Sequence, residues 1–274
     1  MEDSGAPGRI PRIHRARGFR LYDMDGNRLL DLHRDGALLG HRAAASITIM
    51  KNVLSQGLAT GVPSAWERRL TGAITRLYPS HPFVRLYSSA EWALAAAGLY
   101  LGEPIGWGDV MDPALCDDPS AAAGAALARP FLPVPNATVL LPLLPLTICG
   151  APAPACFPEE PPDDVPGSDP LPGFLLAGAL RAAAALLPGQ EGAAPALAGP
   201  AVERAVDGSR AWARRGPYVR AVFDADDWPR VYAEFLRAGV ILGPAYPGPS
   251  VLPGECSPGE TRLLVDLFTG VPGG

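Results

Sequence analysis

The stretch 84-VRLYSSAEWALAAAGLYLG-102 contains the junction on which the interpretation of the chain depends. Its first residues have the pattern of a strand, its Ala- and Leu-rich end that of a helix, and two serines and a glutamate stand between them. The first turn of a helix leaves backbone N–H groups unpaired and carries partial positive charge, so small residues there suit a phosphate group. Ser88-x-x-Glu91 is also the pattern of a capping box, and in isolation capping is the favoured interpretation.

Composition places the chain among globular proteins. Of its 274 residues, 48% are hydrophobic and 19% are charged, with a net charge of −5. Such a length allows one domain or two packed domains. The mild acidity and the lack of a basic run predict no nucleic-acid partner.

Targeting and membrane segments are not expected. Residues 1–18 lack the apolar core of a signal peptide. The most apolar run, residues 137–151, is short and holds two prolines, which predicts a buried strand rather than a membrane span. We therefore expect a cytoplasmic protein.

The N-terminal third predicts a hairpin followed by helices. Residues 19–32 alternate around Asp25-Gly26-Asn27, where Gly26 supplies the positive φ of a tight turn. A helix is predicted over residues 43–58. Ser64-x-x-Glu67 predicts a capping box that opens a second helix, and the apolar face of that helix comprises Trp66, Leu70, Ile74 and Leu77.

The middle of the chain is less regular than its ends. After an Ala-rich piece and the apolar run, residues 151–173 predict an exposed, acidic, Pro-rich loop. The C-terminal part then predicts an αβαβα order, with a further capping box at Ser257-x-x-Glu260. The expected elements are a helix over 174–187, a strand over 218–223, an amphipathic helix over 227–240, a short strand and turn over 241–248, and a final helix over 258–268.

Over residues 18–102 the chain resembles the class III, fold-type I, pyridoxal-phosphate aminotransferases, a group that includes glutamate-1-semialdehyde aminomutase. In that family a hairpin with a D-x-D-G turn precedes an aspartate, a GH pair, a capped helix and a strand ending in SGTEA. Residues 173–269 more loosely resemble the family's small C-terminal domain. The matching positions are Asp23, Asp25, Gly26, Asn27, Asp31, Gly40, His41, Glu67 and Ser88-Ser89-Ala90-Glu91-Trp92.

The resemblance implies an α/β fold of reduced fold-type I architecture. A small α+β domain would come from both termini, joined to a remnant of the large sheet domain. Residues 1–82 would form the N-terminal part of the small domain with lead-in helices, residues 83–173 the remnant with its Pro-rich loop, and residues 174–274 the C-terminal small domain.

The same resemblance implies pyridoxal phosphate as the cofactor, with Ser88, Ser89, Ala90 and Glu91 as the cofactor-binding residues. The family has glycine and threonine where this chain has Ser89 and Ala90, so one hydroxyl is lost at Ala90. Trp92 replaces a small residue and adds bulk at the mouth of the site.

Two residues that the family uses for catalysis are not found. The family has, in the middle of the chain, an aspartate that pairs with the pyridine nitrogen and a lysine that holds the cofactor as a Schiff base. Here the only lysine is Lys51, in the predicted helix after the GH pair. Arginine stays protonated and cannot replace that amine. The sequence therefore predicts no catalytic residue, no covalently held cofactor and no ordinary transamination.

Other candidate residues receive structural interpretations. His41 is interpreted as a turn histidine with a hydrogen-bonded ring. Cys116, Cys149, Cys156 and Cys256 match no zinc pattern and are interpreted as free thiols, and the acidic residues have no calcium-loop spacing, so no metal is expected. The arginines that could instead bind a carboxylate, or simply flank a strand, are Arg214, Arg215 and Arg220.

Three functions remain open on the sequence. The first is a pseudoenzyme that binds a phosphate-bearing ligand or serves as a structural or regulatory partner, as a homodimer or in a heteromer with an aminotransferase-family protein. The second is an active pyridoxal-phosphate aminotransferase or aminomutase completed by a partner chain. The third is an interaction module that keeps only the fold.

Overall fold

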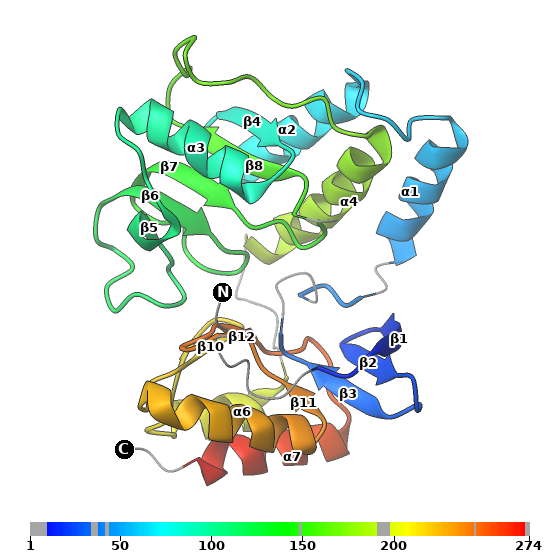
Figure 1. Cartoon of the computed structure of the whole chain (residues 1–274), viewed down its shortest axis with the longest axis vertical. Coiled ribbons are helices and arrows are strands. Elements are labelled where there is room, and N and C mark those ends of the chain that lie inside the picture. The colour runs from blue at the N-terminus through cyan, green and yellow to red at the C-terminus, as the bar shows by residue number, and fades with distance from the viewer. Residues whose placement is uncertain are drawn as a thin grey trace, which may run out of the picture. The chain divides into compact units, whose positions relative to one another are not determined.

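The computed structural model describes residues 10–33, 38–41, 44–147, 150–190, 198–243 and 245–271, without the side chains of 188–190. The chain forms two compact units (Figure 1). The terminal unit combines residues 1–42 with 194–274, and the central unit comprises residues 43–193. Cys149 lies outside the described residues.

The terminal unit holds two small sheets and three α-helices. Its four-stranded sheet has the order β1-β2-β3-β11, in which β11 is parallel to β3, and its three-stranded sheet has the order β12-β10-β9. The strands are β1 (Ile13–Arg17), β2 (Arg20–Asp23), β3 (Arg28–Asp31), β9 (Trp212–Arg215), β10 (Tyr218–Ala221), β11 (Val240–Ile241) and β12 (Ser250–Val251). The helices are α5 (Pro200–Asp207), α6 (Trp228–Arg237) and α7 (Pro258–Gly270).

The predicted hairpin of residues 19–32 is confirmed by the antiparallel pair β2 and β3. Gly26 has φ +84°, as its turn requires. Asp23 Oδ1 accepts hydrogen bonds from the N–H groups of Asp25 and Asn27, at 3.0 and 2.8 Å. The Asn27 side-chain amide also donates to Asp23, which is the main reason that the pKa of Asp23 lies below its usual range. The sequence did not predict β1, which extends this hairpin to a third strand.

The core of the terminal unit is aromatic. The predicted amphipathic helix is confirmed as α6, which buries Trp228, Val231, Tyr232 and Phe235. Trp212 from β9 contacts Phe223, Phe235 and Phe268, with ring centroids 5.3, 5.7 and 5.3 Å apart.

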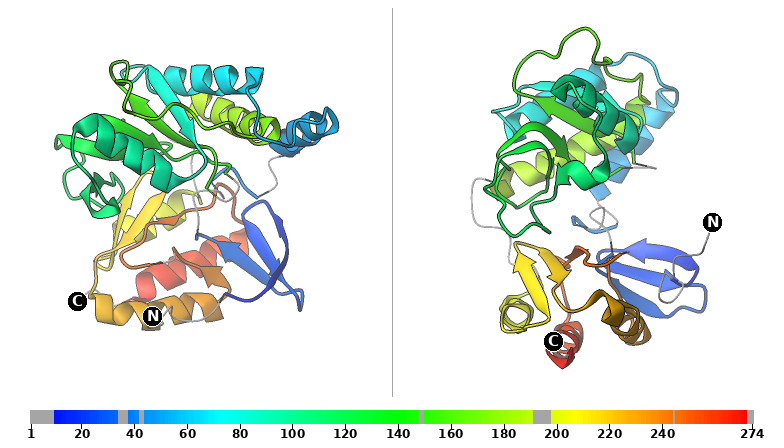
Figure 2. Two further views of the ribbon diagram at one scale, coloured as in Figure 1. Left: turned by 45° about the horizontal axis from the view of Figure 1, so that its top comes forward. Right: turned by 60° about the vertical axis from the view of Figure 1, so that its left-hand side comes forward.

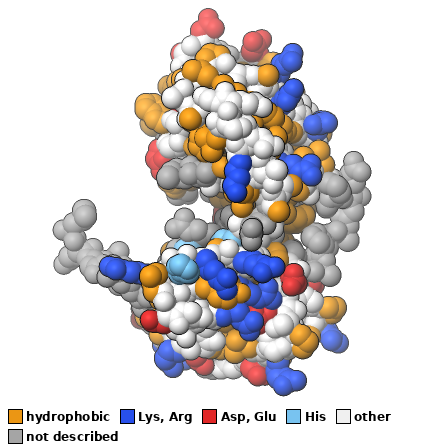
Figure 3. All heavy atoms as spheres, turned by 90° about the vertical axis from the view of Figure 1, so that its right-hand side faces the viewer, with side chains coloured by type: hydrophobic (Ala, Val, Ile, Leu, Met, Phe, Trp, Pro, Cys, Tyr) orange, Lys and Arg blue, Asp and Glu red, His pale blue; other side chains and the backbone are white. Residues whose placement is uncertain are grey.

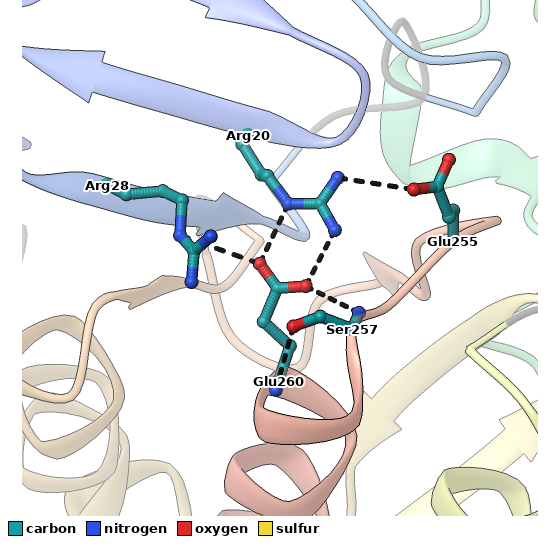
Figure 4. A network of polar contacts seen from close by, with 5 residues as sticks. All are labelled: Arg20, Arg28, Glu255, Ser257 and Glu260. Carbon is teal, nitrogen blue, oxygen red and sulfur yellow. Dashed lines mark hydrogen bonds and ion pairs between the residues drawn. The ribbon is translucent and has the colours of Figure 1, made fainter.

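A buried carboxylate joins the hairpin to α7 (Figure 4). Glu260 and Ser257 form the predicted capping box at the start of this helix. The Glu260 carboxylate also accepts two hydrogen bonds from Arg20 of β2, at 2.8 and 2.6 Å, and Arg28 of β3 lies 3.7 Å away. These interactions lower the pKa of Glu260 to about 2, chiefly through the Arg20 side chain.

Arginines that stand close together in the sequence lie on the hairpin sheet. Arg15 pairs with Tyr22 across β1 and β2, and its guanidinium lies 4.2 Å from the Tyr22 ring centroid. Arg17 pairs with Arg20 in the same ladder. Lys and Arg side chains gather on one face of the molecule in Figure 3. The strands β1 and β2 thus carry three arginines, at positions 15, 17 and 20, on neighbouring rungs of one ladder.

The central unit is built on a five-stranded sheet of order β4-β8-β7-β6-β5. In this sheet β5, β6 and β7 are parallel, and β8 is antiparallel to both β7 and β4. The strands are β4 (Phe83–Tyr87), β5 (Val110–Met111), β6 (Ala123–Ala128), β7 (Ala137–Pro142) and β8 (Ala153–Phe157). The helices are α1 (Ala44–Ser55), α2 (Ala65–Leu77), α3 (Ala90–Leu101) and α4 (Gly173–Gln190).

Helices cover both sides of this sheet. Figures 1 and 2 show α3 on one side and α2 with α4 on the other. All five residues of β8 are buried, as expected of a strand covered on both faces. The helices and strands predicted in residues 43–102 and the helix predicted over 174–187 are confirmed within this unit, as is the buried strand predicted in the apolar run.

Two local predictions for this unit are wrong. Ser64 lies at the N-cap of α2, but its side chain makes no capping bond and its hydroxyl is buried without a partner among the described residues. The segment 151–173 is not wholly an exposed loop, because its first residues form β8. The rest of the segment, residues 158–172, is here called the strap.

Candidate functional site

The junction quoted first, between β4 and α3, lies at the carboxyl edge of the five-stranded sheet. Ser89 is the N-cap of α3, and its Oγ accepts a hydrogen bond from the Trp92 N–H at 3.3 Å. The predicted capping box at Ser88 and Glu91 is therefore wrong by one residue. The pKa of Glu91 lies below its usual range because hydrogen bonds from its own N–H and from Ser89 stabilise the carboxylate.

Ser88 is turned toward the strap instead of capping the helix. Its backbone N–H and its hydroxyl both donate to Asp169 Oδ2, at 2.7 and 2.6 Å. Asp169 lies 81 residues further along the chain. An internal carboxylate thus binds both donors of Ser88, one of the four residues that the sequence assigned to the cofactor.

The strap runs along the outer edge of β4. The Asp169 N–H donates to the Leu86 carbonyl at 2.8 Å, and the Leu86 N–H donates to Ser168 Oγ at 3.1 Å. Tyr87 donates its hydroxyl proton to the Pro166 carbonyl at 2.7 Å. These bonds satisfy an edge strand that would otherwise expose its backbone groups.

A second polar group lies at the same edge of the sheet. Because β4 is parallel to β7, β6 and β5, the carboxyl ends of all four strands point the same way. Asp112 follows β5 and Arg129 follows β6, and they form two hydrogen bonds of 2.7 Å each. Arg129 is only 6% exposed, so this is a buried ion pair.

The sequence analysis missed this pair. The available signal was a charged residue directly after each of two apolar segments, but the shortness of β5 and the Ala-rich composition of β6 concealed both strands. Ligands cluster at the carboxyl ends of parallel strands, so this edge is the candidate site of the central unit.

Comparison with known proteins decides the fold. No family model matches the chain. A transaminase solved with pyridoxal phosphate bound aligns with a TM-score of 0.64 and 16% identity over 97% of this chain and 92% of its own. An ω-transaminase from Sphaerobacter thermophilus aligns with a TM-score of 0.62 and 15% identity over 95% and 90%.

The chain has the fold of the fold-type I pyridoxal-phosphate transferases.

Sequence relatives agree with this fold over part of the chain. The glutamate-1-semialdehyde 2,1-aminomutase of Desulforamulus reducens is 35% identical over 89 residues, which are 32% of this chain and 21% of the aminomutase. The chain thus matches about a fifth of the length of such curated aminomutases. An uncharacterised protein of Treponema pallidum is 29% identical over 89% of this chain and 90% of its own length.

Within this aminotransferase fold, Lys51 lies on α1 and is exposed. Its helix packs on α4, whereas α3 packs on β8, β4 and β7. Lys51 makes no hydrogen bond or ion pair with the residues that the structure describes.

The residues present do not fit covalently held pyridoxal phosphate. Asp169 presents negative charge to the Ser88 donors, where the cofactor would present a phosphate. The lysine that would hold the aldehyde is exposed on α1. At the end of β6 stands Arg129, already paired with Asp112, rather than a carboxylate free to pair with a ring nitrogen.

The remaining candidates have structural partners. His41 Nε2 lies 2.6 Å from Asp31 Oδ2, in agreement with the predicted turn histidine. Arg214 binds Asp207 through two hydrogen bonds, at 2.9 and 2.7 Å, and lies 3.4 Å from Glu203.

Two further kinds of feature, a cluster of metal ligands and a membrane-spanning helix, are absent from the described residues. Among the described residues no three His, Cys, Asp or Glu side chains converge as metal ligands, and the three described cysteines, Cys116, Cys156 and Cys256, are free thiols. None of the described helices is both long and apolar enough to cross a bilayer.

Proposed function

We propose that this chain is a pseudoenzyme of the aminotransferase fold that serves as a structural or regulatory partner and does not transaminate. The observation that supports this most strongly is the position of its only lysine, Lys51, which is exposed on α1. Ser88–Glu91, which we propose as the remnant of a phosphate site, begins a different helix, α3.

The chemistry explains why one lysine decides the question. Transamination requires a primary amine that holds the cofactor aldehyde, exchanges with the substrate amine and moves a proton. Lys51 is exposed and makes no hydrogen bond or ion pair with the described residues, so none of these bonds holds its amine in place for a cofactor. Arg129 is buried but keeps its proton at any accessible pH, so it cannot act as that amine.

An exposed apolar face on α3 supports a role as a partner. Trp92 is 59% exposed and Leu99 is 48% exposed. Seven residues correspond to about two helical turns, so both side chains lie on the same side of α3. Large apolar side chains grouped on a surface are typical of protein contacts. We propose a cytoplasmic homodimer, or a heteromer with an aminotransferase-family protein.

We also propose how the chain divides between a small and a large domain. Residues 1–82 and 174–274 would contribute to the small domain, and residues 83–173 would be the remnant of the large one.

The test is to incubate the chain with pyridoxal phosphate, reduce with borohydride and map modified peptides by mass spectrometry, with Lys51→Arg as matched control. We expect modification of Lys51 only at the rate of an exposed lysine in an unrelated protein. Stoichiometric modification of Lys51 at equimolar cofactor, lost in Lys51→Arg, would show that the chain holds the cofactor itself.

A further inference from the structure

We propose that Asp169 is an internal ligand that closes the phosphate-type turn of α3, so that the chain excludes phosphate from a site its fold would otherwise offer. This inference rests on the proposed function, because it explains how the remnant site is used in a chain that does not hold the cofactor. It concerns Ser88 and the strap, and it makes no use of Lys51.

The hydrogen bonds between Ser88 and Asp169 are the main support for this proposal. Ser88 directly precedes Ser89, the N-cap of α3, and its backbone N–H and hydroxyl are two donors that an anion at this turn could use. Both already donate to one oxygen, Asp169 Oδ2, at 2.7 and 2.6 Å. These are short, charge-assisted bonds at the positive end of a helix dipole, where a carboxylate is favoured for the same reasons as a phosphate.

The strap holds this carboxylate in place before any ligand arrives. Asp169 is fixed through its own N–H to Leu86, at 2.8 Å. Upstream, Arg85 donates to the carbonyls of Pro166 and Pro161, at 3.0 and 3.2 Å, and to that of Val165.

Gly61 packs closely against the C-terminal end of the strap. A Cβ placed at Gly61 would lie 2.1 Å from the Pro170 carbonyl oxygen, so only glycine allows the strap to pass there. Because its loop is ordered in this way, Asp169 competes with free anions as an intramolecular ligand at high effective concentration.

Negative charge on the strap further disfavours binding of phosphate at this turn. An arriving phosphate would face the Asp169 carboxylate, and the strap also carries Glu159, Glu160, Asp163 and Asp164 as exposed residues. None of these four makes an ion pair with the residues that the structure describes. The like charges disfavour a bound anion while Asp169 stays in place.

The test measures binding of inorganic phosphate to the intact chain by isothermal titration calorimetry, with sulfate as a second probe. Asp169→Ala removes the internal ligand and Asp169→Asn removes only its charge. Asp163→Ala is the matched control, since Asp163 is exposed on the same strap. We expect no measurable binding to wild type or Asp163→Ala at about 10 mM phosphate.

In Asp169→Ala we expect at least tenfold tighter phosphate binding, and addition of Ser88→Ala to this variant should abolish the gain. Phosphate binding to wild type as tight as to Asp169→Ala would overturn the proposal, and so would the absence of any gain in both Asp169 variants.

A second measurement needs no ligand. Amide hydrogen exchange at Ser88, compared with that of the other amides of the central unit, should be slow in wild type and in Asp163→Ala, and at least tenfold faster in Asp169→Ala. Asp169→Asn keeps an acceptor oxygen and should lie between them. Equal exchange at Ser88 in wild type and in Asp169→Ala would contradict the proposed bond. Lys51-dependent turnover would refute the proposed function but would leave both of these results unaffected.

Discussion

We expect replacement of Glu260 to lower the free energy of unfolding more than replacement of an exposed acidic residue in the terminal unit. Glu260 is 6% exposed and accepts bonds from Arg20 and from the Ser257 N–H. Glu260→Gln leaves the Arg20 guanidinium without its buried counter-ion, and we expect a loss of about 2 kcal/mol in the free energy of unfolding, after allowance for solvent screening. Denaturant unfolding followed by circular dichroism measures it.

Glu255→Gln is the matched control for this change. The Glu255 side chain is 78% exposed and lies 3.9 Å from Arg20, so its removal should cost less than about 0.5 kcal/mol. Equal losses in Glu255→Gln and Glu260→Gln would show that the buried pair contributes nothing specific.

The same carboxylate gives a pH dependence. The folded-state pKa of Glu260, about 2, lies below its ordinary value of 4.5, so its contribution is complete above about pH 5 and is lost as pH falls through 2. The stability difference between wild type and Glu260→Gln should therefore be constant above about pH 5 and shrink from there toward pH 2. Unfolding midpoints measured at several pH values test it, and a gap that widens on acidification contradicts it.

At the junction of β4 and α3, the sequence predicted the strand, the turn and the helix but not the roles of the two serines. Ser88 and Glu91 have the spacing of a capping box, yet Ser89 caps the helix. The deciding interaction, between Ser88 and Asp169, joins residues 81 apart. Such a contact depends on how the strap folds back onto β4, so the sequence around Ser88 contains no pattern that predicts it.

At the scale of the element, α2 and α7 both begin with a Ser-x-x-Glu pattern, but only the serine of α7 forms a capping hydrogen bond. Ser257 accepts the Glu260 N–H at 3.3 Å, so we expect Ser257→Ala to destabilise the fold by about 1 kcal/mol. The Ser64 hydroxyl is buried and caps nothing, so Ser64→Ala should change stability by less than about 0.5 kcal/mol, or raise it. Chemical denaturation of both variants tests this, and the reverse order would disprove the assignment.

The strap gives a second prediction at this scale. Arg85→Ala removes the donors that fix the carbonyls of Val165, Pro166 and Pro161, so the strap should open more often. We expect a glutamate-specific protease to cut after Glu159 several times faster in Arg85→Ala; the bond after Glu160 precedes Pro161 and is not cleaved by such a protease. Arg68→Ala, at an exposed site on α2, is the control. Equal cleavage rates in the two variants would mean that Arg85 does not hold the strap.

Periodicity explains which elements the sequence predicted. Helices such as α6 have one buried face and were found from their spacing. The strands β6 and β8 are short and Ala-rich, and β8 is buried on both faces, so neither alternates between polar and apolar residues. Pro154 within β8 made that segment look like a loop.

At the scale of the whole molecule, the fold was predictable because the hairpin, the capped helix and the strand–turn–helix keep their order over residues 18–102. The middle of the chain was not, because its sheet is assembled from strands with little local signal. The Asp112–Arg129 pair is a product of that assembly and appears only once β5 and β6 lie side by side.

The central claim, that this fold no longer supports transamination, is tested most directly in a single-turnover experiment. The chain is mixed with pyridoxal phosphate and an excess of amino acid, and pyridoxamine phosphate is measured over time by chromatography. The account predicts the same rate for wild type, for Lys51→Arg and for an equal concentration of an unrelated protein. Formation of pyridoxamine phosphate that is faster with wild type, and that falls to the background rate in Lys51→Arg, would contradict it.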